Sequence, residues 1–135
     1  MGKSTTGGYW RQKGATGGTP AVGVNCIQFT LDPTAASADT GKVLPIGSIP
    51  IWVSNINGGA TGGASPTIDV GISSNDDGFA AELPADAISA PVVTGALIGV
   101  ELTANTAIYA GVGASAATGG SVIVGVYYIM ADTGL

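Results

Sequence analysis

The chain has 135 residues, of which 23 are glycine, and only 10% of its residues are charged, with a net charge of −5. An apolar share of 45% excludes general disorder, and the glycine content argues against a helical bundle or coiled coil. The chain has no histidine and a single cysteine, Cys26, which excludes Ser-His and Cys-His catalytic pairs, an internal disulfide and a cysteine zinc site. We therefore expect one non-enzymatic domain that needs no metal or other cofactor.

The first 25 residues read as an extended arm ahead of the folded domain. Lys3, Arg11 and Lys13 give its first 13 residues a charge of +3, whereas one lysine and nine acids follow. Tyr9 and Trp10 lie among these cations, and both residue types are enriched in binding hot spots. We expect Tyr9, Trp10, Arg11 and Lys13 to bind an acidic partner surface, the alternative being a frayed chain end.

Two classes of partner are not expected. Three basic residues beside an acidic domain make a weak electrostatic footprint for nucleic acid. The most apolar stretch, residues 122–131, is too short to span a bilayer as a helix, and the first 20 residues lack the apolar core of a signal peptide. We expect a protein made in a cytoplasm and not attached to a membrane.

Residues 26–135 are predicted to form a single all-β domain. Apolar residues recur at every second position, which is typical of half-buried antiparallel strands. In chain order the predicted strands are residues 27–31, 49–53, 68–72, 98–102, 108–112 and 122–130, with shorter ones at 79–83 and 92–94. In the second of these, Ile49, Ile51 and Val53 are expected to share one face.

Turn chemistry separates these strands. The tetrapeptide ATGG occurs at residues 15–18, 60–63 and 117–120, and residues 75–78 (Asn-Asp-Asp-Gly) are predicted to form another turn. Long connections favour two antiparallel sheets packed as a jelly-roll-like sandwich. An immunoglobulin-like sandwich or a small barrel would show much the same pattern.

The last predicted strand is apolar on both faces. Val122, Val124 and Val126 begin one face, while Ile123, Tyr127 and Ile129 lie on the other. Leaving these three in water would forgo roughly 1.5–3 kcal/mol each, so we expect Ile123, Tyr127 and Ile129 to form an oligomer interface. The alternative is a central strand covered by a loop or by the arm.

The few oxygen-rich positions give weak signals. Residues 75–77 could offer oxygen ligands to calcium, but they lack the spacing of a calcium loop, and a solvated turn is the preferred interpretation. Glu82 and Glu101 are candidates for a carboxylate pair only if the fold brings them together. Trp52 could stack on a sugar or simply fill a sheet face.

Residues 44–87 carry a set of linked features. They are Leu-Pro-x-Gly before a strand, a Gly/Ala-rich turn, then Thr-Ile-Asp-Val-Gly-Ile, an Asn/Asp turn and Phe79; a Val/Tyr-rich strand at residues 121–130 follows. This pattern resembles small structural proteins of tailed bacteriophages, in particular capsid decoration (cement) proteins and head-fibre base proteins. The resemblance covers residues 44–130 and includes no catalytic signature.

The resemblance implies a virion component on the outer capsid surface, a β-sandwich that is often trimeric and binds the major capsid protein. Such a protein would stabilise the mature head by binding only the mature lattice. Two other functions stay open: a carbohydrate-binding or adhesin module that reads glycans with Trp52 or Tyr109, and a tail or baseplate sandwich.

Overall fold

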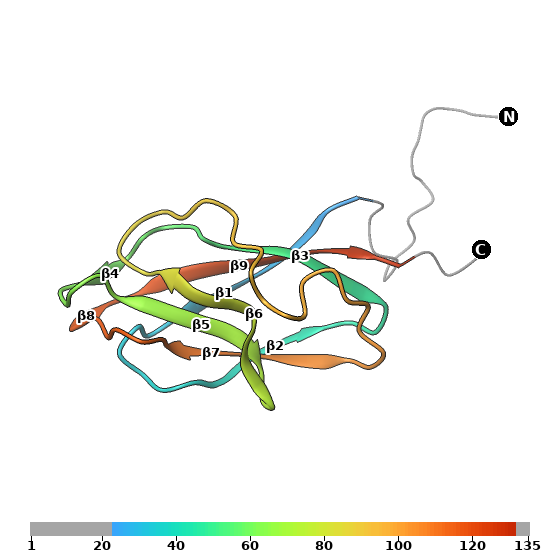
Figure 1. The fold of residues 1–135 in the computed structure, drawn as a ribbon, viewed down its shortest axis with the longest axis horizontal. Coiled ribbons are helices and arrows are strands. Elements are labelled where there is room, and N and C mark those ends of the chain that lie inside the picture. The colour runs from blue at the N-terminus through green and yellow to red at the C-terminus, as the bar shows by residue number, and fades with distance from the viewer. Residues whose placement is uncertain (1–22, 132–135) are drawn as a thin grey trace, which may run out of the picture.

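The computed structural model describes residues 23–131, and these form a two-layer antiparallel β-sandwich (Figure 1). The strands are β1 (Asn25–Leu31), β2 (Ala38–Leu44), β3 (Ser48–Asn55), β4 (Ala60–Thr61), β5 (Thr67–Ile72), β6 (Asn75–Pro84), β7 (Thr106–Val112), β8 (Gly119–Gly120) and β9 (Val122–Met130). One sheet has the order β1-β9-β3 and the other β2-β7-β5-β6, with β4 and β8 as a small separate ribbon. The all-β prediction is confirmed.

The chain crosses between the two sheets repeatedly, and this gives a jelly-roll strand order. From β1 it passes to β2 in the opposite sheet, back to β3, and again to the β5–β6 hairpin. An isolated bridge between Val53 and Val92 then brings the chain back beside β3 before it continues to β7 and β9. The strand expected at residues 92–94 is therefore reduced to this single bridge.

The core lies between the two sheets. Its fully buried side chains include Phe79, Leu44, Ile68, Leu83 and Ile108. Along β5 and β9 every second residue faces this core, as the period-two pattern predicts. The first residue of β1, Asn25, lies opposite Tyr128 near the end of β9, so the described chain enters and leaves the sandwich at one end (Figure 1).

Two predicted elements are wrong. Residues 98–102 are not a strand: residues 96–99 form turns, in which Ile98 N–H donates to Gly95 O and Val100 N–H to Leu97 O, and residues 100–102 are irregular. Gly99 has φ +81°, a left-handed conformation that ends any extended run. Residues 75–78 are not a turn but the start of β6, because Ile72 pairs with Asn75 and the turn is Ser73–Ser74.

One strand escaped prediction, and the two later ATGG tetrapeptides do more than form turns. β2 has the sequence ADTGKVL, which lacks apolar alternation. Ala60 pairs with Gly120 and Thr61 with Gly119, so each tetrapeptide supplies one strand of the β4–β8 ribbon. Gly62, Gly63 and Gly120 have positive φ, as expected for turn glycines.

Candidate functional site: an uncharged sheet face

The side of the three-stranded sheet that points away from the core carries no charged residue, and we call it the uncharged face. The strand register defines it, since Cys26 and Trp52 both lie opposite Tyr127, and Ile49 lies opposite Ile129. Its members are Cys26, Gln28, Thr30, Ile49, Trp52, Ser54, Ile123, Gly125, Tyr127 and Ile129, with Ile56 just beyond β3.

All three residues predicted for an oligomer interface lie on this face. Ile123, Tyr127 and Ile129 follow one another along β9 at alternate positions, and each is only partly buried. Tyr128 and the valines of the strand fill the core instead. The interface prediction is therefore consistent with the orientation of these side chains, although the pairing of copies itself stays a prediction.

Two apolar residues of β3 also lie on the uncharged face, and the period-two pattern of the sequence assigned the faces of this strand wrongly. Ile49, Ile51 and Val53 were expected on one face, but the register between β3 and β9 shifts between Pro50 and Trp52. This bulge reverses the alternation, so Pro50 and Val53 are buried while Ile49 and Trp52 share the uncharged face. The face is therefore wider and more apolar than the sequence predicted.

An aromatic pair lies in the middle of the face. The rings of Trp52 and Tyr127 are stacked, with centroids 4.9 Å apart and planes 24° from parallel. Gly125, two residues before Tyr127, has no side chain. A methyl group added there would crowd the side chains of Tyr127, Ile56 and Cys26, so these three side chains pack closely over the glycine. Stacked aromatics of this kind are common anchors in protein interfaces.

The two titratable groups of the face stay neutral near pH 7. Burial raises the pKa of the Cys26 thiol above its usual value of 9.0, although hydrogen bonds with Tyr127 and Gln28 oppose this. Burial also raises the pKa of the Tyr127 phenol above 10.0, and the neighbouring Cys26 adds to the shift. An interface that buries this face therefore does not have to remove water from any ionised group.

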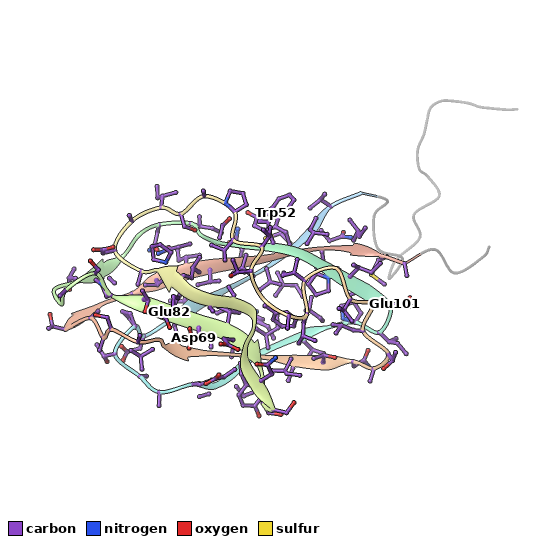
Figure 2. The ribbon with its side chains drawn as sticks, in the orientation of Figure 1. Trp52, Asp69, Glu82 and Glu101 are labelled. Carbon is purple, nitrogen blue, oxygen red and sulfur yellow. The ribbon has the colours of Figure 1, made fainter. Side chains whose placement is uncertain are left out.

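The outward side of the four-stranded sheet has the opposite character. Asp39 and Tyr109 face each other across β2 and β7, and Asp69 lies opposite Gly111. Figure 2 shows Asp69 and Glu82 close together over β5 and β6, well away from Trp52. Trp52 and Tyr109 lie on different sheets, so they cannot form one sugar-stacking platform.

Glu82 is held by several hydrogen bonds despite its exposure. Its carboxylate accepts from Thr67 Oγ1 at 2.6 Å and from the backbone N–H of Ala114 at 3.0 Å, and its own N–H donates to Asp69 Oδ1 at 2.9 Å. The bonds from Thr67 and Ala114 hold the pKa of Glu82 below its usual value. Burial raises the pKa of Asp69, and the charge of Glu82 contributes to this.

This pair does not match a catalytic or metal-binding arrangement. Figure 2 separates Glu101 from Glu82, so the two glutamates considered for glycoside hydrolysis do not meet. In residues 23–131 no three carboxylate or cysteine side chains are grouped to hold a metal ion.

Within the same residues no helix is long and apolar enough to cross a membrane. Tyr9, Trp10, Arg11 and Lys13 lie outside the described residues.

Comparison with known proteins finds similarity to a phage capsid structure. No protein-family model matches the chain, and no curated protein matches it. Among solved structures, a chain of the cyanophage Pam1 capsid asymmetric unit is similar, with a TM-score of 0.58 and 25% sequence identity. The match covers 90% of this chain and 97% of that chain, so the two are of nearly equal length. It supports the expected likeness to phage capsid-associated proteins, while the decoration role stays a prediction.

Proposed function

We propose that this chain is a structural protein of a bacteriophage virion that decorates the outer surface of the capsid. In this role it binds the major capsid protein and stabilises the mature head, acting as a homotrimer and without catalysis or a cofactor. The observation that carries the proposal is the similarity to a chain of a phage capsid over almost the full length of both chains.

The uncharged face supports the self-association part of the proposal. Interface centres are depleted in charged residues and enriched in aromatic ones, and this face combines Trp52, Tyr127 and four isoleucines with no charge. Each partly buried isoleucine or tyrosine that loses its remaining solvent contact adds to the hydrophobic free energy. A trimer formed through Ile123, Tyr127 and Ile129 would use this term.

The charge distribution supports a separate contact with the capsid. Lys3, Arg11 and Lys13 all precede residue 14, whereas Lys42 is the single basic residue after that point. An acidic partner surface would repel the acidic body, so the basic aromatic segment is the part of the chain suited to contact it. We assign Tyr9, Trp10, Arg11 and Lys13 to binding of the major capsid protein.

Capsid co-sedimentation tests the proposal. A variant lacking residues 1–13 should keep the circular dichroism spectrum of the parent chain but bind purified capsids of its phage at least about tenfold more weakly, because the proposed anchors are gone. Lys42→Ala is the matched control, since it removes one positive charge from the exposed β2 strand and should leave binding unchanged. Undiminished capsid binding by the shortened chain would refute the assignment of the arm.

The trimer is tested on its own. Tyr127→Asp places a charge in the centre of the uncharged face and should convert the trimer to smaller species in light scattering. Tyr109→Asp changes the same residue type on the opposite sheet and should leave the trimer intact. A parent chain that is monomeric at micromolar concentration would exclude the self-association part.

A further inference from the structure

The loop between β3 and β4, residues 56–59, contains a dipeptide that is chemically unstable in an open chain. Five asparagines occur in the sequence, and only Asn57 is followed by a glycine. A backbone nitrogen can attack the side-chain amide carbon of the asparagine before it, and glycine permits this best because it has no Cβ beside its nitrogen. Asn57–Gly58 is therefore the place in this chain where spontaneous deamidation is expected first.

Deamidation at this dipeptide has two steps, and water is its only other reactant. The Gly58 nitrogen loses its proton and bonds to Cγ of Asn57, while the bond from Cγ to Nδ2 breaks, so ammonia leaves and a five-membered succinimide ring remains. Water then adds to one of the two ring carbonyls and opens the ring. Opening at Cγ gives aspartate, and opening at the main-chain carbonyl of residue 57 gives isoaspartate, whose main chain runs through Cγ.

The folded loop holds the attacking nitrogen in an unreactive state. Gly58 N–H donates to Oδ1 of Asn55 at 2.9 Å. Asn55 is fully buried, and its Nδ2 donates to Pro84 O at 2.9 Å and to Ala85 O at 3.0 Å, which fixes the direction in which Oδ1 points. Because the Gly58 proton is donated to a buried acceptor, a base from solvent cannot remove it until this bond breaks.

The amide group that would be attacked is held by the start of β9. Oδ1 of Asn57 accepts from Ile123 N–H at 2.9 Å and from Gly59 N–H at 3.1 Å, and its Nδ2 donates to Ser121 O at 3.1 Å. The two donors polarise the carbonyl and by themselves would favour attack, as in an oxyanion hole. Protection of the site therefore depends on the bond that retains the Gly58 proton.

We propose that Asn57 is a latent deamidation site, which the folded loop keeps unreactive and which reacts when residues 56–59 separate from Asn55 and from β9. Asn57 is exposed, so water reaches the succinimide as soon as it forms. The proposal rests on the hydrogen bonds of this loop and does not depend on the capsid role.

The reaction would prevent the loop from closing again. Aspartate at position 57 has an oxygen in place of Nδ2, so Ser121 O loses its donor and faces a negatively charged oxygen. Isoaspartate adds one carbon to the main chain, so the spacing that the loop's hydrogen bonds require is also lost. Ile123 belongs to the uncharged face, so an open loop releases one end of that face from its support.

Peptide mapping by mass spectrometry measures the reaction in the full chain. Chymotrypsin cleaves after aromatic residues and releases residues 53–79 as one peptide, which contains Asn55, Asn57 and Asn75. In buffer Asn57 should convert at least about tenfold more slowly than in guanidinium chloride, a ratio that corresponds to about 1.4 kcal/mol for opening the loop. Asn55 and Asn75 precede isoleucine and aspartate and serve as internal controls that should stay intact.

Two glycine variants test whether the loop controls the rate. A methyl group on Gly59 would collide with Ser121 O, whereas one on Gly119 would meet Thr61 Oγ1 at 3.3 Å. Gly59→Ala should therefore speed deamidation in buffer by at least about fivefold, and Gly119→Ala should leave the rate unchanged. In guanidinium chloride the two variants and the parent chain should react at one common rate, because no loop is then formed.

Asn57→Asp reproduces one product and tests whether it disfavours the closed loop. This variant should unfold at a lower urea concentration than the parent chain, because it loses the bond to Ser121 O. Asn105→Asp is the matched control, since Asn105 accepts from Ile46 N–H through an oxygen that aspartate also has. It adds the same charge and should keep a midpoint close to that of the parent.

The outcomes that contradict the proposal are distinct. Equal deamidation of Asn57 in buffer and in guanidinium chloride would overturn it, as would equal rates for the two glycine variants in buffer. A urea midpoint of Asn57→Asp equal to that of Asn105→Asp would refute the effect of the product on the loop.

Discussion

Asn55 shows how one buried polar side chain connects strands that are distant in sequence. Its Nδ2 donates to Pro84 O at 2.9 Å and to Ala85 O at 3.0 Å, while its Oδ1 accepts from Gly58 N–H at 2.9 Å. The side chain is fully buried, and its donor and acceptor groups are all used. It therefore holds the end of β3 against the end of β6 and is a structural residue, not a ligand.

Asp69 and Glu82 differ in how they depend on pH. Glu82 has φ 56°, an uncommon value for a residue other than glycine, and its hydrogen bonds favour the ionised carboxylate. Asp69 is partly buried beside Glu82, Asp76 and Asp77, and its surroundings favour the protonated form. The two carboxyl groups therefore contribute to stability with opposite signs.

We predict that Asp69→Asn raises the free energy of unfolding at pH 7 by up to about 1 kcal/mol, a limit set by solvent screening. The wild-type pKa is raised on folding, so the ionised group costs stability at neutral pH, and asparagine keeps an oxygen for the Glu82 N–H. The gain should shrink as the pH falls through the folded pKa of Asp69, above 3.8, since the wild-type group is then protonated. Urea denaturation between pH 3 and pH 8 measures this.

Glu82→Gln is the control of opposite sign. The folded pKa of Glu82 lies below 4.5, so its carboxylate stabilises the fold above that pH and loses this contribution as the pH falls. The glutamine variant should be less stable at pH 7 and approach the wild type in acid. If both variants gained stability, or both lost it, with the same pH dependence, the opposite pKa shifts assigned to Asp69 and Glu82 would be wrong.

At the scale of elements, period-two alternation predicted the strands that contact the core on one side. β1, β5, β7 and β9 all alternate in the sequence and in the structure. β2 could not be found this way, because it is an edge strand whose residues are mostly exposed. Residues 98–102 alternate but form turns, since Gly99 takes a conformation that the pattern does not encode.

The candidate site was predictable only in part for a related reason. Ile123, Tyr127 and Ile129 lie on an uninterrupted strand, so alternation placed them on one face. Ile49 and Trp52 come from β3, where one extra residue reverses the alternation. The bulge depends on the pairing of β3 with β9 and on the backbone bonds that Val92, Gly99 and Leu102 make to β3, neither of which is local in sequence.

A prediction for the β4–β8 ribbon follows from the space around Gly59, which precedes β4, and Gly119, which lies in β8. A methyl group on Gly59 would collide with the carbonyl oxygen of Ser121, whereas one on Gly119 would meet only Thr61 Oγ1 at 3.3 Å. Gly59→Ala should therefore lower the free energy of unfolding by about 1–3 kcal/mol. Gly119→Ala should change it by less than about 0.5 kcal/mol, as for an ordinary surface substitution.

Urea denaturation of both variants measures this difference. Neither glycine has a positive φ, so the comparison isolates crowding from backbone strain. Equal stabilities of the two variants would mean that the ribbon relaxes freely and does not restrain the end of the sandwich.

At the scale of the whole molecule, the two sheets present surfaces of different kinds. The three-stranded sheet shows an uncharged face with an aromatic pair, and the four-stranded sheet carries Asp39, Asp69 and Glu82. A molecule with this asymmetry has a defined orientation when it is bound in an assembly, because only one of its broad faces can be buried without cost to ionised groups.

The pairing of Asn25 with Tyr128 brings the first and last strands of the sandwich together at one end. Because these residues are adjacent, a short glycine-serine linker between residues 131 and 23 should be tolerated, with new ends opened between Ser73 and Ser74, which are exposed. We predict that this circularly permuted chain keeps the far-ultraviolet circular dichroism spectrum of the parent and unfolds cooperatively. Loss of cooperative unfolding would mean that the β5–β6 hairpin must stay covalently closed for the two layers to pack.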